Sequence, residues 1–235
     1  MTPYKIDQPL EYIHFLESWM DALPGGDLKK LVPVPENCAV ISVDVIKGFC
    51  SIGPLASPRV AEIIKPIERL IRKAWDIRIR NILFIQDTHE PDAVEFGSYP
   101  PHCVRGTEES ETVNELKSLP FFHKIVVMEK NSISSGLDTG LNDWLLHHPE
   151  VDTFIVVGDC TDLCTYQLAM HLRLDANARQ LKRRVILPVD CVDTYDMPLD
   201  QAAEIGAVPH PASFIHAVFL HNMHLNGVEI FASIQ

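Results

Sequence analysis

Cys164 is the residue whose place in the sequence most favours chemistry. It follows an apolar run that stops at Gly158, and a helical pattern begins directly after it. A thiol at this place lies beyond the carboxyl end of a buried strand, where ligands of parallel α/β sheets collect. The N-terminal dipole and the free N–H groups of a helix also stabilise a thiolate and lower its pKa. A lone cysteine is more often a small core residue, so both interpretations stay open on position alone.

Two further ionisable residues stand at the ends of apolar runs. Asp44 lies inside one run, where a carboxylate is costly unless it is paired or used, and Lys130 closes another. Alone, the first could be a structural loop cap and the second a solvated charge. Together with Cys164 they form a chemical set, because a carboxylate can take the thiol proton and an ammonium can lie between the two anions. We therefore predict that Asp44, Lys130 and Cys164 converge.

A second group of residues has the composition of a metal site. Asp87 and His89 are two residues apart, which places both on one side of an extended strand end, and Glu95 and His102 follow in the next loop. That loop, from Asp87 to about Gly106, is long and irregular, as functional loops often are. Two imidazoles with two carboxylates suit zinc, iron or manganese. A purely structural interpretation of the group stays open.

Strands alternating with helices must position these residues. Nearly continuous runs rich in Val and Ile are typical of strands covered on both faces. These runs occupy 39–45, 81–86, 124–128, 152–158, 184–189 and 227–231. Helical patterns lie at 58–77, 108–118, 138–147, 161–180, 199–206 and 210–223. The alternation predicts an α/β, Rossmann-like fold with a doubly wound, mainly parallel six-stranded sheet and helices on both faces.

The first 36 residues are a separate segment, and the alternating pattern fills 37–235. Before Pro24-Gly25-Gly26, apolar residues recur at helical spacing. They are Tyr12, Ile13, Leu16, Trp19 and Met20. We predict an N-terminal helical extension, 1–36, that packs on the outside of the core domain, 37–235; a subunit contact or a lid is the alternative.

Charge and composition exclude several functions. The net charge of −12 comes from 20 basic and 32 acidic residues with no basic block, which argues against nucleic-acid binding. No apolar run reaches the length of a membrane span. Six cysteines in 235 residues are too few for a dense disulfide framework, and the N-terminus has no apolar signal-peptide core. We expect a cytoplasmic protein without nucleic-acid or membrane partners.

At these residues the chain resembles the nicotinamidases of the isochorismatase-like cysteine hydrolase superfamily, over about residues 38–231. Three stretches in this order carry the resemblance, with Lys130 between the last two: VDVIKGFC at 43–50, YPPHCVRGT at 99–107 and GDCTDLC at 158–164. The resemblance implies an isochorismatase-like fold and a catalytic triad of Asp44, Lys130 and Cys164. It implies hydrolysis of nicotinamide to nicotinate and ammonia through a cysteine thioester.

The resemblance also implies a cofactor and an assembly. The cofactor would be a divalent metal, zinc in the first place, with iron or manganese as alternatives. Its ligand set would match Asp87, His89, Glu95 and His102. Relatives commonly form dimers or tetramers, so a homo-oligomer that acts on a small-molecule amide is expected.

Further roles follow from the resemblance around the nucleophile. A cis peptide bond would fall between Asp159 and Cys160, and the N–H groups of Cys160 and Cys164 would face the developing oxyanion. Phe49 and Tyr99 would form aromatic walls for the pyridine ring. Asp159 stands where relatives usually have an apolar residue, and Thr165 replaces their usual valine. Both departures bear on the substrate.

Other functions stay open beside the nicotinamidase interpretation. One is a related metal-free amidase that acts on an N-carbamoyl or ureido compound. Another is a non-catalytic metal-binding module on the same fold. Isochorismatase proper needs no nucleophilic cysteine, so Cys164 counts against it. A thiol-redox role is disfavoured because Cys160 and Cys164 are four residues apart, which is not the C-x-x-C spacing.

Overall fold

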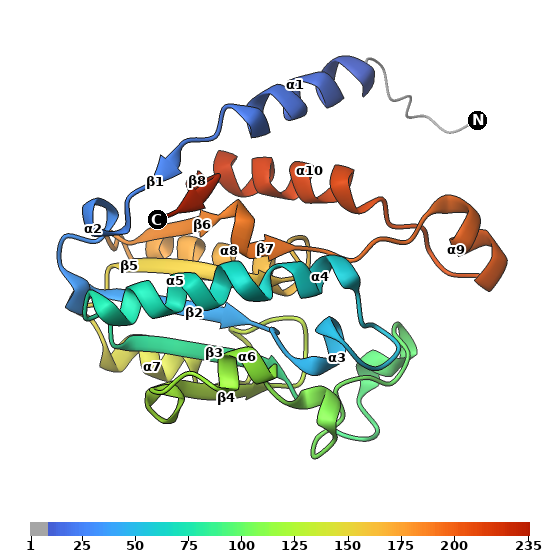
Figure 1. Cartoon of the computed structure of the whole chain (residues 1–235), viewed down its shortest axis with the longest axis horizontal. Helices are drawn as coiled ribbons and strands as arrows, with labels where there is room; N and C mark the ends of the chain where they lie inside the picture. The colour runs from blue at the N-terminus through green and yellow to red at the C-terminus, as the bar shows by residue number, and fades with distance from the viewer. Residues whose placement is uncertain (1–8) are drawn as a thin grey trace.

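A central parallel sheet organises the chain, as Figure 1 shows for the computed structural model, which describes residues 9–235. Its strands follow the order β4-β3-β2-β5-β6-β8, and β7 pairs with β5. Every pairing in this sheet is parallel. The strands are β2 (Cys38–Val43), β3 (Asn81–Asp87), β4 (Val126–Lys130), β5 (Thr153–Asp159), β6 (Arg184–Pro188), β7 (Val192–Asp193) and β8 (Glu229–Phe231).

The predicted doubly wound α/β fold is confirmed, with one correction. The sheet has seven strands, not six. The missed strand, β7, contains only Val192 and Asp193, which is too short to produce an apolar run. From β2 the chain builds outward through β3 and β4, then returns to add β5 on the other side. The carboxyl ends of β2 and β5 therefore form the switch point, where ligands of such sheets bind.

Helices cover both faces of the sheet, as expected (Figure 1). Val40 of β2 packs in the core beneath α4 and α5, whereas its neighbour Ile41 packs in the core beneath α7 and α8, because successive strand residues point to opposite faces. The longer helices are α4 (Pro58–Glu62), α5 (Ile64–Asp76), α7 (Leu141–His147), α8 (Cys164–Ala178), α9 (Leu199–Ile205) and α10 (Ala212–Leu225). Shorter ones are α2 (Leu28–Leu31), α3 (Lys47–Cys50) and α6 (Asn114–Lys117).

The single helix predicted at 58–77 is two helices, α4 and α5, which meet at Ile63. Pro66 explains the break. It has no N–H to donate to the Glu62 carbonyl, and its ring clashes with that carbonyl. The second helix, α5, begins two residues before the proline, so Pro66 lies in its first turn.

The helix predicted at 108–118 is wrong for most of its length. The structure has a 3₁₀ turn at Glu108–Ser110 and the short α6. Between them Thr112 forms an isolated β-bridge with Ile46, and its hydroxyl accepts a hydrogen bond from Gln86 Nε2 at 2.8 Å. These tertiary contacts hold the segment extended and override the local helical pattern.

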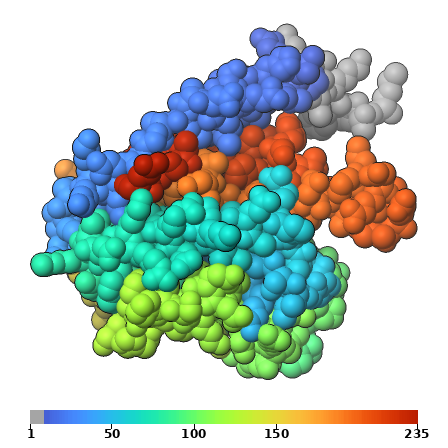
Figure 2. Space-filling view, in the orientation of Figure 1, coloured from blue at the N-terminus to red at the C-terminus, as the bar shows by residue number. Residues whose placement is uncertain are grey.

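The first helix, α1 (Pro9–Asp21), lies along α10 on the outside of the sheet (Figures 1 and 2). Leu16 is buried, and the Tyr12 hydroxyl lies 3.0 Å from His221 Nδ1. The chain then adds β1 (Gly25–Gly26) to β9 (Ser233–Ile234) in a small second sheet. The division into an extension and a core domain at residue 36 stays a prediction.

No helix among residues 9–235 is both long and apolar enough to traverse a bilayer. Figure 2 shows that α9 projects from the body of the molecule beyond the carboxyl end of the sheet.

Candidate active site

The three predicted catalytic residues lie at or after the carboxyl ends of neighbouring strands. Asp44 follows β2 with a φ of 56°, Lys130 is the last residue of β4, and Cys164 is the first residue of α8 after β5. Gly158 permits the close approach of β5 to β2. Its φ is 122°, and a Cβ there would lie 2.0 Å from the Val43 carbonyl oxygen. Only glycine fits this position.

The three side chains meet in a buried cluster. Lys130 Nζ lies 2.8 Å from Asp44 Oδ2, in a close ion pair, and 3.6 Å from Cys164 Sγ. The exposed fractions are 0% for Asp44, 1% for Lys130 and 6% for Cys164. Residues from distant parts of the sequence thus form one contact set of the kind predicted.

Asp87 is a fourth member that the sequence analysis assigned only to the metal group. Its carboxylate forms an ion pair with the Lys130 ammonium, and its backbone N–H donates to Asp44 Oδ1 at 2.7 Å. An oxygen from Asp44, one from Asp87 and the Cys164 sulfur all lie within 4.8 Å of one another. Lys130 is therefore the shared counter-ion of two buried carboxylates beside the thiol.

Burial sets the protonation of this cluster. It raises the pKa of Asp44 to about 6, with repulsion from Asp87 adding to the effect and Lys130 opposing it. Burial would lower the pKa of Lys130, but Asp44 and Asp87 outweigh it and hold that pKa well above its usual range. Lys130 is thus an ammonium, and Asp44 is mostly ionised at neutral pH.

The thiol differs from the sequence-based expectation. Burial raises the pKa of Cys164 well above its usual range, and the Lys130 ammonium offsets this only in part. Desolvation of the anion is the largest influence, and the nearby Asp44 and Asp87 carboxylates add to it. Burial thus favours the thiol form of Cys164, which lies beside the Asp44 carboxylate.

Three of the four predicted metal ligands come together. One donor atom each from Asp87, His89 and His102 lies within 4.8 Å of the others, and all three residues are buried. His89 Nε2 is 3.6 Å from Asp87 Oδ1 and 4.0 Å from Glu95 Oε1. Glu95 lies on a 3₁₀ turn at Val94–Gly97. It borders the group but is not one of the three residues whose donor atoms lie within 4.8 Å of one another.

The hydrogen bonds of both histidines fit a metal. His89 Nδ1 faces Asn131 Oδ1 at 3.1 Å, and His102 Nδ1 faces the Pro100 carbonyl oxygen at 2.8 Å. These acceptors place the ring proton on Nδ1 and leave the Nε2 lone pair free. His89 Nε2 is buried without a hydrogen-bond partner among the described residues. A divalent cation would supply that partner, and this donor set suits zinc, iron or manganese.

Aromatic rings border the metal group. The ring centroids of Phe49 and Tyr99 lie 5.6 Å and 6.2 Å from that of His102, so both predicted wall residues are next to it. Phe96 was not among the predicted residues, but its ring centroid lies 5.5 Å from that of His89 and 5.7 Å from that of His102. Its position directly after Glu95 in the same loop could have indicated that it lies beside the metal group.

Two other residues were missed. Asn131 orients His89, and its position directly after Lys130 at a strand end could have indicated this role. Tyr195 follows β7 by two residues, and the Asp193 carbonyl of β7 accepts a hydrogen bond from the Thr161 N–H, in the loop between β5 and α8, at 3.0 Å. Burial raises the pKa of Tyr195 to about 12. Nothing in the sequence pattern links Tyr195 to that loop.

The loop between β5 and α8 contains two backbone N–H groups without backbone acceptors. The Asp159–Cys160 peptide bond is cis, at the position that the family resemblance implied. Among the described residues, the Cys160 and Cys164 N–H groups donate to no backbone acceptor. The Cys160 carbonyl instead accepts from Leu163 and Thr165 and closes the loop. Two free N–H groups are the donors that an oxyanion requires.

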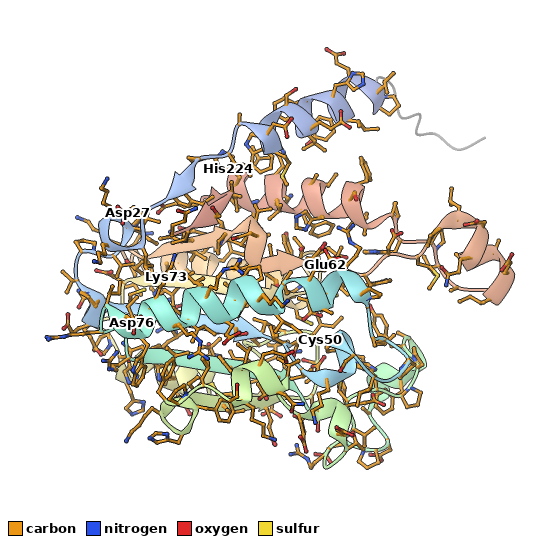
Figure 3. All side chains as sticks on the ribbon, in the orientation of Figure 1. Asp27, Cys50, Glu62, Lys73, Asp76 and His224 are labelled. Carbon is orange, nitrogen blue, oxygen red and sulfur yellow. The ribbon has the colours of Figure 1, made fainter. Side chains whose placement is uncertain are left out.

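A separate hollow of about 780 Å³ lies at the other end of the sheet. Asp27, Lys73 and Asp76 line it, and Figure 3 shows them far from Cys50, which lies on α3 after Asp44. It shares no residue with the triad or the metal group.

The comparisons agree with this fold and site. The isochorismatase domain matches residues 38–214, and the chain therefore belongs to the isochorismatase family. Nicotinamidase 1 of Arabidopsis thaliana is 30% identical over 88% of this chain and 95% of its own length. The nicotinamidase/pyrazinamidase of Mycobacterium tuberculosis is 31% identical over 63% of this chain and 83% of its own.

A solved structure extends the comparison of the fold. The pyrazinamidase of Pyrococcus horikoshii in complex with zinc superposes with a TM-score of 0.64 at 24% identity, over 83% of this chain and 98% of that one. The resemblance to the nicotinamidase branch and the isochorismatase-like fold are thereby confirmed.

Proposed function

We propose that the protein hydrolyses nicotinamide to nicotinate and ammonia through a thioester on Cys164. Family membership and the nicotinamidase relatives make the chain an amide-hydrolysing enzyme. The substrate and the chemical steps are our proposal. The observation that carries it is the contact of Lys130 Nζ with both Asp44, at 2.8 Å, and Cys164, at 3.6 Å.

In the first half-reaction, ionised Asp44 takes the thiol proton of Cys164 while Lys130 stays charged beside both groups. The thiolate attacks the carboxamide carbon. A C–S bond forms, and the carbonyl π electrons move to the oxygen. The Cys160 and Cys164 N–H groups stabilise that oxyanion, each contributing about 3 kcal/mol. When the tetrahedral intermediate collapses, the C–N bond breaks and protonated Asp44 gives its proton to the leaving ammonia.

In the second half-reaction, Asp44 takes a proton from water as the water oxygen attacks the thioester carbon. The C–S bond then breaks, the proton held by Asp44 restores the Cys164 thiol, and the nicotinic acid that leaves gives its carboxyl proton to the solvent to become nicotinate. One carboxyl group thus serves as base and acid in turn, which suits a pKa near the working pH. Burial supplies that condition, because it raises the pKa of Asp44 to about 6.

The neighbouring donors would bind a divalent metal and the ring. Asp87, His89 and His102 would hold the cation, with Glu95 close enough to join them. When bound, it would supply a Lewis acid for the ring nitrogen and so orient the substrate. Phe49, Phe96 and Tyr99 would flank the ring and exclude water. A common amide substrate thus accounts for both groups.

An ammonia-release assay tests the proposal. Purified protein is given nicotinamide, pyrazinamide and an N-carbamoyl amino acid, and its metal content is measured in parallel. We expect release from nicotinamide and a bound divalent metal. Release only from the N-carbamoyl compound by a metal-free protein would favour the ureido amidase instead.

A nucleophile variant tests the covalent step. Cys164→Ala should keep the fold and lose ammonia release. Cys38→Ala is the matched control, because Cys38 is also buried but begins β2 at the opposite end of the strand from Asp44. Substantial activity in Cys164→Ala would refute the thioester.

The family resemblance further supports a cytoplasmic dimer or tetramer. Light scattering of the purified protein tests the assembly, and a monomer at micromolar concentration would contradict it.

A further inference from the structure

Asp162 anchors the loop between β5 and α8, and both of its carboxylate oxygens have partners. Thr194 Oγ1 donates to Oδ1 at 2.6 Å, and His210 Nε2 lies 2.9 Å from Oδ2. The Asp162 side chain is only 7% exposed, so water has little access to replace either partner. Loss of one contact would therefore leave a buried carboxylate oxygen unpaired, which is costly unless the loop moves.

His210 is held at its other ring nitrogen, on its ring face and through its backbone. Its Nδ1 lies 2.8 Å from the Tyr195 carbonyl oxygen, and its ring stacks on the Tyr195 ring with centroids 4.0 Å apart. Carbonyl and carboxylate oxygens only accept, so the ring donates to both when it carries both protons. A backbone bridge between His210 and Met197 closes the base of the segment 198–209, which carries α9 (Figure 1).

Asp162 lies between the two residues whose N–H groups are the proposed oxyanion donors. It follows Cys160 by two residues and precedes Cys164 by two, in one turn of the chain. The Cys160 carbonyl oxygen accepts from the Leu163 and Thr165 N–H groups, both at 3.1 Å, so the turn is compact. A shift of Asp162 would therefore move the neighbouring donors with it.

We propose that His210 is a positioning residue for amide hydrolysis: by pairing with Asp162, it holds the Cys160 and Cys164 N–H groups where the oxyanion forms. The inference rests on the proposed function. The hydrogen bonds of His210 go to Asp162, Tyr195 and Met197, and not to the triad or the metal group. Its loss should therefore weaken an interaction made only in the transition state, which lowers kcat and leaves KM nearly unchanged.

Asparagine and glutamine at position 210 separate the two ring contacts. A glutamine amide N–H reaches the place of Nε2, towards Asp162, whereas an asparagine amide N–H reaches only the place of Nδ1. His210→Asn should lower kcat for nicotinamide about tenfold or more, with KM within about twofold. His210→Gln should keep kcat within about threefold of the wild type. Equal losses of kcat in the two variants, or an unchanged kcat in His210→Asn, would overturn the inference.

His148 offers a matched control. Its Nδ1 lies 2.8 Å from the Trp144 carbonyl oxygen, and its ring stacks on the Trp144 ring at 4.1 Å, which repeats the contacts of His210 with Tyr195. His148 lies between α7 and the amino end of β5, at the opposite end of that strand from Cys164. His148→Asn should leave kcat unchanged. A tenfold fall in this variant would show a general effect of histidine replacement and overturn the role of His210.

A double-variant cycle tests whether His210 acts through Asp162. Asp162→Ala should lower kcat at least as much as His210→Asn does, and adding His210→Asn to it should lower kcat by less than about twofold more. Losses that multiply in the double variant would mean that His210 acts by another route, which would overturn the inference. If His210→Asn does not fold, Asp162→Ala alone decides, because an unchanged kcat in that variant contradicts the anchoring of the loop.

The inference and the proposed function fail in different ways. A wild-type protein that releases no ammonia from nicotinamide contradicts the proposed function. An active wild type whose kcat is the same in His210→Asn contradicts only the role of His210.

Discussion

Replacing Lys130 with methionine should destabilise the protein in a way that depends on pH. Methionine has nearly the same length, so the main change is the loss of an ammonium between the buried Asp44 and Asp87. At an effective dielectric constant of 20, a charge pair 2.8 Å apart is worth about 6 kcal/mol. Removing one partner of a buried pair typically costs about 3–5 kcal/mol.

The pH dependence follows from the carboxyl groups that lose their partner. In the wild type the pKa of Asp44 is raised from 3.8 to about 6, so its contribution to stability is complete below pH 3.8 and is lost as pH rises to 6. Without Lys130 that pKa rises further, and the loss continues above pH 6. Each pH unit adds about 1.4 kcal/mol, so the penalty should grow by about 3 kcal/mol between pH 6 and 8.

Urea unfolding at pH 6 and pH 8, with a chelator present, measures this difference. Lys117→Met is a suitable control, because Lys117 pairs with Glu111 on the surface and should matter little at either pH. An equal loss of stability at the two pH values for Lys130→Met would refute the reasoning. It would mean that no buried carboxyl group depends on this ammonium.

Other predictions concern activity, metal and backbone. The kcat/KM for nicotinamide should fall below a pH of about 6, where the Asp44 base becomes protonated, and Asp44→Asn should abolish turnover; a pH-independent rate would contradict this. His89→Ala should remove the bound metal, and Asn131→Ala should weaken metal affinity by about 10–100-fold, as titration with a competing chelator would show. Gly158→Ala should fail to fold or lose most of its stability in urea unfolding, because its Cβ would overlap the Val43 carbonyl.

The sequence predicted those secondary-structure elements that are determined by local residue patterns. Continuous Val- and Ile-rich runs located six strands, since a strand buried on both faces must be apolar throughout. The convergence of Asp44, Lys130 and Cys164 could be predicted because Asp44 interrupts such a run, Lys130 ends another, and Cys164 begins the helix that follows a third. Parallel topology then brings the carboxyl ends of β2, β4 and β5 to one edge.

Features that depend on tertiary contacts could not be predicted in this way. The two-residue strand β7 forms only through its parallel pairing with β5. Thr112 lies in a segment with a helical sequence pattern, but it is extended in the structure and its hydroxyl accepts a hydrogen bond from Gln86. The direction of the Cys164 pKa was also wrong, because the helix dipole can be inferred from sequence but the extent of burial cannot. Tyr195 follows β7, whose pairing with the end of β5 no local pattern shows.

Asp87 joins the two groups that the sequence presented as separate. One carboxylate forms an ion pair with Lys130 and also lies within 4.8 Å of the free donor atoms of His89 and His102. A cation bound by the histidines would compete with Lys130 for the negative charge of Asp87. Lys130 would then be shared less with Asp87 and would interact more strongly with Asp44 and the Cys164 sulfur. By this reasoning the metal group would affect the acid–base balance of the triad as well as the position of the substrate, so loss of the metal should change kcat as well as KM.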